Sequence, residues 1–334
     1  MRAVQLSGYG GVEVMRVAAG VAIPKIVSPK GVVVKVNATA VNRGDTMQRK
    51  GFYPPPPGAS DILGLEAAGV VAEVGAGVSK WKVGDRVMGL LSGGGYAEYV
   101  PVHEGHLMPI PEQMSFVEAA AVSEVFLTAW QCLRFNMDVQ KGDHVLIHAA
   151  ASGVGTAASQ LVERVIGGVA VGTASEGKLE ECRKYASHCV SRTVDPESKT
   201  QFASKVRAAV GDRINAVIDP VFGGGYLQES VSVCAVDGTI TVLAMMGGNT
   251  IESYQCSEMF KKRITLRFST LRGRTDEYKA GLVSSFVEHA LPQFTAKDKA
   301  LVPVISKVLP LEEVREAHRM VGANETIGKV VLTL

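Results

Sequence analysis

Cysteine is scarce in this 334-residue chain, which has five, and the first 131 residues contain none. The odd count and the lack of any Cys-x-x-Cys spacing exclude a disulfide framework and a zinc knuckle. An excess of charge is also missing, since 35 basic side chains stand against 33 acidic ones. This balance gives no sign of a nucleic-acid or anionic-membrane partner. We therefore expect reduced thiols and no dedicated nucleic-acid partner.

A long hydrophobic run is missing as well. The longest stretch without Asp, Glu, Lys or Arg covers residues 144–162, and Gly153 and Gly155 within it would interrupt a membrane helix. The basic residue near the N-terminus is not followed by an apolar run, so no signal peptide is indicated. We expect a soluble, cytoplasmic protein with no membrane partner.

What the chain does have is a change of pattern near residue 120. Before it, short apolar stretches are separated by glycine and proline, which predicts an all-β, barrel-like region with one helix at residues 43–50. After it, strands alternate with helices, which predicts a doubly wound parallel sheet. The six expected strands are residues 144–149, 169–173, 190–194, 214–219, 239–244 and 264–268. Beyond residue 269 we expect helices at 276–291 and 311–321, and a strand at 327–332 that returns to the first region.

The sharpest motif is a G-x-G-x-x-A turn that follows the first of these strands. Gly153 is expected to allow the tight turn, Gly155 to let backbone N–H groups approach a pyrophosphate, and Ala158 to let helix pack on strand. The start of the following helix offers unpaired N–H donors to the phosphates. A glycine turn with a purely structural role is the alternative, but the position in an alternating strand and helix series favours a dinucleotide site.

The end of the next strand bears on the choice between NADH and NADPH. An NAD site usually has a carboxylate there, whereas this chain has Thr173, Ala174 and Ser175. Ser175 can donate to a 2′-phosphate, and Lys178 can neutralise it. Glu176 argues mildly for NADH, and Lys178 has the alternative of an ordinary exposed lysine. We expect NADPH.

Several blocks together resemble the zinc-independent, zeta-crystallin-like quinone oxidoreductases of the medium-chain dehydrogenase/reductase superfamily. Residues 42–53 fit N-R-x-D-x-x-x-R-x-G-x-Y, and the resemblance spans essentially the whole chain. Further matching blocks are residues 63–69, 84–87, 94–99, 127–129 and 327–332. Residues 55–60, 148–158 and 246–248 are most similar to the tumour-suppressor-inducible branch.

The resemblance implies an α/β protein with a GroES-like β-barrel catalytic domain, residues 1–122 and 269–334, and a Rossmann NADPH-binding domain, residues 123–268. It also implies an active site in the cleft between them, and a homodimer. The residues expected to bind the cofactor are Thr128, Ser152, Gly153, Val154, Gly155, Thr173, Ser175, Lys178, Arg192, Met246, Gly247 and Lys329. Two departures stand out. Thr193 occupies the place of a family tyrosine, where Arg192 would serve the phosphate instead, and Ser123-Glu124 replaces the usual proline.

The residues exclude a catalytic zinc. The zinc-dependent relatives need a cysteine where Asn42 stands and a histidine where Leu65 stands. Leucine cannot ligate zinc, and an amide is a poor ligand beside thiolate or imidazole. His103 and His106 have no third ligand nearby and are expected to be surface or packing residues.

Without a metal, reduction has to rely on the orientation of an already electrophilic substrate and on hydrogen bonds to the oxygen that gains charge. Tyr53 and Asn42 are the expected donors. Asp45 is a further candidate, although a bond to backbone or to Arg49 is the more ordinary role for it. We expect an NADPH-dependent quinone reductase that transfers hydride or single electrons. The alternatives are an enone or alkenal double-bond reductase and a weakly active NADPH-binding protein with a structural or RNA-binding role.

Overall fold

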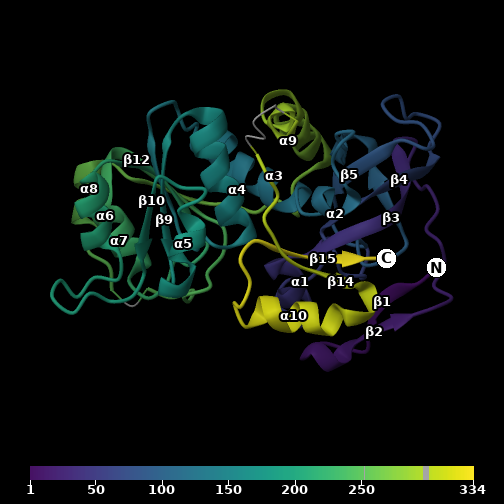
Figure 1. The fold of residues 1–334 in the computed structure, drawn as a ribbon, viewed down its shortest axis with the longest axis horizontal. Helices are drawn as coiled ribbons and strands as arrows, with labels where there is room; N and C mark the ends of the chain where they lie inside the picture. The colour runs from purple at the N-terminus through teal and green to yellow at the C-terminus, as the bar shows by residue number, and fades with distance from the viewer. Residues whose placement is uncertain (252, 296–300) are drawn as a thin grey trace. The chain divides into compact units, whose positions relative to one another are not determined.

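The computed structural model describes residues 1–251, 253–295 and 301–334, which divide into two compact units. Unit 1 comprises residues 1–127 and 271–334, and unit 2 comprises residues 128–270. Figure 1 shows the β-rich unit 1, which contains both termini, and the alternating strands and helices of unit 2. The β-rich first region and the alternating second region are those that the sequence predicts.

Unit 1 is built on a seven-stranded sheet of order β14-β15-β3-β4-β5-β7, with β6 paired to β3. The strands of this sheet are β3 (Gly31–Val41), β4 (Glu66–Val74), β5 (Arg86–Leu90), β6 (Tyr99–His103), β7 (Leu107–Pro109), β14 (Ile305–Pro310) and β15 (Lys329–Thr333). A separate two-stranded sheet consists of β1 (Ala3–Leu6) and β2 (Met15–Ala18). The last strand pairs antiparallel with β3, so that Val330 lies opposite Val41, and the predicted return of the terminal strand is confirmed.

Unit 1 also contains helices. They are α1 (Arg43–Arg49), α2 (Phe116–Ala119), α9 (Asp276–His289) and α10 (Val314–Gly322), with short turns η1 (Val12–Val14), η2 (Glu104–His106), η6 (Leu291–Phe294) and η7 (Leu311–Glu313). Buried aliphatic side chains of β3, β4, β5 and β6 form one core cluster, and those of β1, β15 and α10 form another. The two clusters hold β3 and β15 rigidly, and these strands carry or border the polar groups described below.

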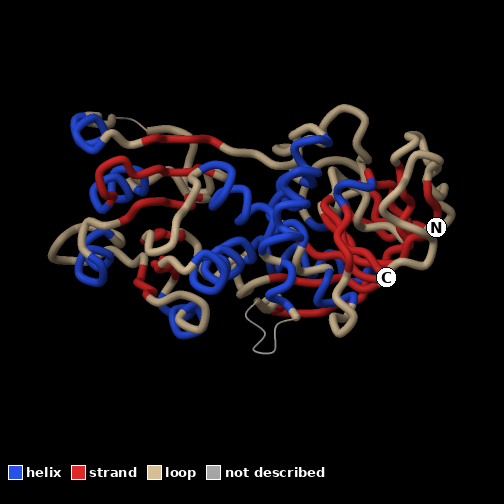
Figure 2. The backbone as a smooth tube through the Cα atoms, turned by 90° about the horizontal axis from the view of Figure 1, so that it is seen from above, coloured by secondary structure: helices blue, strands red, loops and turns tan. Residues whose placement is uncertain are grey.

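Unit 2 is a six-stranded parallel sheet of order β10-β9-β8-β11-β12-β13. Its strands are β8 (His144–Ile147), β9 (Val169–Ala174), β10 (His188–Ser191), β11 (Ile214–Asp219), β12 (Cys234–Val242) and β13 (Thr265–Phe268). Figure 2 shows helices flanking the strands of this unit. The helices are α4 (Gly153–Leu161), α5 (Leu179–Cys182), α6 (Ala203–Val210), α7 (Tyr226–Val233) and α8 (Ser257–Lys262), with η3 (Gln131–Asn136), η4 (Val162–Ile166) and η5 (Glu176–Lys178).

Strand β8 lies at the point where the order of this sheet reverses, because β9 pairs on one side of it and β11 on the other. Ligands of open α/β sheets bind outside the carboxyl ends of the strands at such a point. The G-x-G-x-x-A turn follows β8 directly, so the fold puts it where a nucleotide would be held.

One helical stretch has the length and composition of a membrane span. Residues Phe116–Asn136, which include α2, α3 (Ser123–Trp130) and η3, have a mean hydropathy of 1.3 in their most apolar window, and 72% of that window is buried. A core helix of a folded protein has the same properties, and the extent of burial favours that interpretation here.

Candidate functional site

A buried ion pair joins the two chain segments, residues 1–127 and 271–334, that form unit 1. The Lys329 ammonium at the start of β15 lies 2.8 Å from Glu66 Oε1 at the start of β4, with side chains 4% and 0% exposed. Lys329 Nζ also donates to the Val41 carbonyl at 3.0 Å and to Asn42 Oδ1. An ammonium has three N–H donors, and these three oxygens use all of them. The structure therefore places Lys329 inside unit 1 with no donor left for the cofactor role that the sequence suggested.

Asn42 is part of the same network. Its Nδ2 donates to Glu66 Oε1 at 2.8 Å and to the Ala40 carbonyl at 3.3 Å, while its Oδ1 accepts from Lys329. Both amide hydrogens are thereby used. The geometry supports Asn42 as the residue that holds Glu66 and Lys329 in place, and not as the direct donor to substrate that the sequence suggested.

Asp45 caps the first turn of α1. Its Oδ2 accepts from the Asn42 backbone N–H at 2.8 Å, and its Oδ1 accepts from the Gly64 N–H at 2.9 Å. Complete burial raises the pKa of the Asp45 carboxyl to about 6, although the two backbone donors favour the charged form. Of the two roles considered from the sequence, the structure shows the bonding to backbone.

Tyr53 follows α1 and is half-buried. The Arg272 guanidinium lies over its ring, 5.1 Å from the centroid, and donates to the Gln48 Oε1 atom at 2.8 Å and to the Ser92 carbonyl at 2.9 Å. Burial, together with the nearby Glu124 carboxyl, raises the pKa of the Tyr53 phenol to about 12. Within the described part of the chain, no group bonds the Tyr53 hydroxyl. A neutral phenol held by a cation on its ring face is thus free to bond a ligand.

Glu124 completes the polar cluster at the start of α3. Its backbone N–H donates to Glu66 Oε2 at 2.8 Å, which fixes the first turn of the helix to the ion pair. Its side chain is half-buried, and burial, reinforced by the Glu66 charge, raises the pKa of the Glu124 carboxyl to about 8. In the sequence, Glu124 stands out only as a departure from the family. A signal for Glu66 did exist, since it is a carboxylate directly followed by six apolar residues, 67–72.

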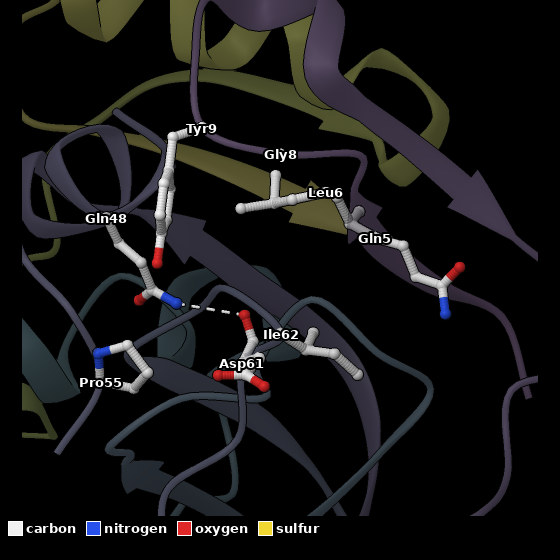
Figure 3. Close-up of a pocket in the computed structure, with 9 residues that line it drawn as sticks. Gln5, Leu6, Gly8, Tyr9, Gln48, Pro55, Asp61 and Ile62 are labelled. Carbon is white, nitrogen blue, oxygen red and sulfur yellow. Dashed lines mark hydrogen bonds between the residues drawn. The ribbon is translucent and has the colours of Figure 1, made fainter. Parts of the chain in front are cut away.

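A separate cavity of about 530 Å³ lies elsewhere in unit 1 (Figure 3). Gln48 lines it and donates to the Asp61 carbonyl at 3.1 Å, the contact drawn in the figure. The other lining residues are Val4, Gln5, Leu6, Gly8, Tyr9, Pro55, Asp61 and Ile62. Tyr53, Asn42 and Asp45 are not among them, so this cavity and the polar network are distinct features, and Gln48 links them by also accepting from Arg272.

The turn after β8 in unit 2 presents free backbone donors. Ser152 caps α4, and its Oγ accepts from the Gly155 N–H at 3.0 Å. The N–H groups of Gly153 and Val154 have no acceptor among the residues that the structure describes. They sit at the positive end of a nine-residue helix, which suits a phosphate. This turn fits the pyrophosphate of a nicotinamide dinucleotide.

The two glycines act differently from each other. The left-handed residue of the turn is Ala149, with φ of 52°, and not Gly153, which is simply the first residue of α4. The expected turn role of Gly153 is therefore wrong. At Gly155 a Cβ atom would lie 2.4 Å from the Ala149 carbonyl oxygen and 2.6 Å from the Ala150 Cα. Only glycine lets α4 begin so close to the preceding strand.

The side chain of Thr173 is bonded inside unit 2. It is fully buried, and its Oγ1 bonds His148 Nδ1 at 3.0 Å, while His148 Nε2 bonds Ser230 Oγ at 2.9 Å. The side chain of Thr173 belongs to this internal chain of hydrogen bonds, and the predicted contact of Thr173 with a cofactor stays a prediction. Ser175 directly follows β9, and Lys178 is the last residue of η5. Both are half-buried, and their contacts with a cofactor stay predictions.

The other predicted cofactor residues follow carboxyl ends of strands or lie at the start of the unit. Arg192 follows β10 and is exposed, and its backbone N–H donates to the Ala174 carbonyl at 3.0 Å. Met246 and Gly247 follow β12, and the Gly247 N–H donates to the Val221 carbonyl at 2.8 Å. Thr128 is half-buried within α3. Their contacts with a cofactor stay predictions.

No group of three or more His, Cys, Asp or Glu side chains suited to a metal ion occurs in residues 1–251, 253–295 and 301–334. Leu65 is buried beside α1, and Asn42 is held by Glu66 and Lys329. His103 Nδ1 accepts from the Gly105 N–H, and burial lowers the pKa of the neighbouring His106 to about 4. Both histidines thus pack within unit 1.

A dinucleotide turn at the switch point of a parallel sheet, joined to a β-rich unit with a buried polar network, defines a nicotinamide-dependent oxidoreductase of two-unit architecture. The alcohol dehydrogenase GroES-like domain matches residues 28–112, and the family described as zinc-binding dehydrogenase matches residues 186–332. The chain belongs to the medium-chain dehydrogenase/reductase superfamily, within the group of quinone oxidoreductases and VAT-1-like proteins. The predicted α/β fold with GroES-like and Rossmann parts is confirmed.

Particular relatives match over the whole chain. The human quinone oxidoreductase is 31% identical over 340 residues, which cover 100% of this chain and 98% of that protein. The crystal structure of a quinone oxidoreductase from Pseudomonas syringae has a TM-score of 0.82 at 28% identity, covering 100% of this chain and 99% of that one. The CurK enoyl reductase has a TM-score of 0.83 at 28% identity, covering 99% and 98%.

Proposed function

We propose that this protein is an NADPH-dependent quinone reductase that works without a metal ion, on the tumour-suppressor-inducible branch of the family. The observation that carries the proposal is the Tyr53 phenol, which is half-buried, held by Arg272 and unbonded in the described chain. A phenol so placed can donate to a substrate oxygen as negative charge develops on it. A quinone is electrophilic enough to accept hydride with this help alone. Relatives named quinone oxidoreductase support the substrate class.

The residues that would hold the cofactor are those of unit 2. Gly153 and Val154 offer backbone N–H groups to the pyrophosphate, and Ser175 and Lys178 meet the 2′-phosphate. When bound, the nicotinamide supplies the hydride. The protein residues bind and orient the two reactants. Tyr53 bonds the reacting oxygen. The contacts among Asn42, Glu66 and Lys329 hold the start of α1 against the start of β4.

An enone or alkenal double-bond reductase is the second candidate, favoured by the likeness to the CurK enoyl reductase. It needs the same donor, because hydride addition to an enone also places negative charge on an oxygen. Consumption of NADPH with an ortho-quinone, a para-quinone and a 2-alkenal, each measured against NADH, separates the candidates. Turnover with the quinones supports the first proposal, turnover with the alkenal alone supports the second, and none with any of them contradicts both.

Lys178→Ala is expected to raise the NADPH dissociation constant about tenfold or more. The reason is that one charge-assisted contact to a phosphate contributes roughly 1.5–3 kcal/mol. NADH lacks the 2′-phosphate, so its binding should hardly change. Titration calorimetry with both nucleotides measures the effect, and Lys184→Ala, an exposed lysine paired with Glu181, is the matched control. Equal losses for the two nucleotides would defeat the assignment.

Tyr53→Phe is expected to lower kcat more than it raises KM. One hydrogen bond that strengthens in the transition state is worth about 1–3 kcal/mol, or roughly 5- to 150-fold in kcat/KM. Steady-state kinetics with several quinones measures the loss. Tyr99→Phe on β6 is the control and should behave as wild type. If the Tyr53→Phe protein keeps full kcat/KM, the hydroxyl is idle and Tyr53 only lines the site.

A further inference from the structure

Two buried cations of unit 1 bond the same residue. Arg272, in the segment before α9, is 5% exposed, and Lys279, on α9, is 4% exposed. Arg272 Nε donates to the Ser92 carbonyl at 2.9 Å, and Lys279 Nζ donates to the Ser92 hydroxyl at 2.9 Å. Ser92 follows β5 and is itself half-buried. The two cations therefore lie close together at one partly exposed residue.

Neither cation forms an ion pair within the residues that the structure describes, because the acceptors of both are neutral oxygens. Asp276, one turn before Lys279, is 60% exposed and lies 3.4 Å from His106 instead. Burial lowers the pKa of the Lys279 ammonium and of the Arg272 guanidinium. A buried charge without a partner costs stability, so an anion bound at this place would be favoured.

Both side chains keep N–H donors that such an anion can use. Arg272 also donates to Gln48 Oε1 at 2.8 Å and to the Tyr53 carbonyl at 3.3 Å. Two of its five N–H groups, and two of the three on Lys279, have no acceptor in the described part of the chain. The bonds to three separate segments fix the guanidinium in place, and its planar shape matches a carboxylate.

Other charges near the two cations do not replace an anion. Glu124 acts on both cations and Asp45 acts on Arg272, each without direct contact. The Asp45 carboxylate already accepts two backbone N–H groups. Burial raises the pKa of Glu124 to about 8, so most Glu124 side chains are protonated at neutral pH. The field at Ser92 is therefore positive.

We propose that Arg272 and Lys279 form a carboxylate-binding site beside Tyr53, and that the preferred substrates are quinones that carry a carboxylate on a short side chain. The substrate part of this inference rests on the proposed function. The Arg272 guanidinium lies 5.1 Å from the centroid of the Tyr53 ring, so one substrate can reach both. The carboxylate bonds the free N–H groups of the two cations while the Tyr53 hydroxyl bonds the reacting oxygen.

The first test measures binding without any reaction. Calorimetry with benzoate and with neutral benzamide, at saturating NADPH, should show that only benzoate binds to wild type. Lys279→Gln removes the charge but keeps an N–H donor for Ser92, and it should weaken benzoate binding about tenfold or more, since the lost contact is charge-assisted. Lys279→Arg should retain the binding. Lys307→Met changes an exposed lysine on β14 and is the control.

The second test measures substrate preference. A para-naphthoquinone with a propanoate side chain should have a kcat/KM at least tenfold above that of its propanamide analogue, and Lys279→Gln should lower this ratio at least fivefold. No benzoate binding to wild type overturns the site, whether or not the variants fold, and equal binding to wild type and Lys279→Gln does so too. Equal kcat/KM for the two quinones overturns the substrate preference. Lys279-dependent benzoate binding without turnover of either quinone supports the carboxylate site and contradicts the proposed function.

Discussion

Replacing Lys329 with methionine is expected to lower the free energy of unfolding by about 3–5 kcal/mol, the usual cost of leaving a buried charge without its partner. Glu66 has no exposed surface, and Lys329 is its only cationic contact within the residues that the structure describes. Such a loss should lower the melting temperature by on the order of 10 °C. Chemical denaturation and calorimetry measure it.

The double variant Lys329→Met with Glu66→Gln should recover much of this stability, because it removes both charges together. Lys307→Met, on the neighbouring strand β14, changes an exposed lysine and should leave stability within about 0.5 kcal/mol of wild type. A single variant as stable as wild type would show that the ion pair contributes little. The double variant also tests the predicted cofactor role, since an unchanged NADPH dissociation constant would remove Lys329 from the nucleotide site.

Gly155→Ala is expected to weaken NADPH binding at least about a hundredfold. The three atoms nearest to the added Cβ would be backbone atoms, at 2.4 to 2.7 Å, so the turn from Ala149 to Ala150 must move. That movement displaces the N–H groups of Gly153 and Val154, each worth roughly 1.5–3 kcal/mol to a charged phosphate. Overpacking should also cost unit 2 about 1–3 kcal/mol of stability.

Gly281→Ala on α9 is the matched control, because a Cβ there meets nothing within 4 Å. It should leave both the dissociation constant and the melting temperature close to wild type. Nucleotide binding by calorimetry and thermal unfolding in the absence of nucleotide separate the two effects. Wild-type affinity in the Gly155→Ala protein would mean that the turn does not hold the phosphates.

Most strands of unit 2 could be predicted because they are short apolar runs between turns. Strand β10 is the exception in position, since it is His188–Ser191 and not the predicted 190–194. Strand β11 was predicted with its observed bounds, Ile214–Asp219. Strand β12 begins at Cys234, five residues before the predicted start, because its register against β11 is irregular between Ile214 and Ala216 and Asp237 adopts φ of 65°. An apolar pattern does not reveal such an irregularity, which depends on the neighbouring strand.

The site was less accessible to sequence reasoning. Tyr53, Asn42 and Asp45 lie within one short segment and could be singled out together, but what each bonds depends on distant residues. Lys329 is 287 positions from Asn42, and only the pairing of β15 with β3 brings them into contact. The bonding of the Thr173 side chain could not be predicted either, because nothing in its own strand shows that His148, just after the neighbouring strand β8, would bond its hydroxyl.

The division of the chain between the units has a consequence for its synthesis. Unit 2 is one uninterrupted piece, residues 128–270, whereas unit 1 draws on both sides of it. On the ribosome all strands of unit 2 emerge before β15, so unit 2 can fold while β3 is paired with β4 and β6 but still lacks β15. Until Lys329 is added, Glu66 has no countercharge to be buried with. Unit 1, whose translation starts before that of unit 2, is therefore completed after it.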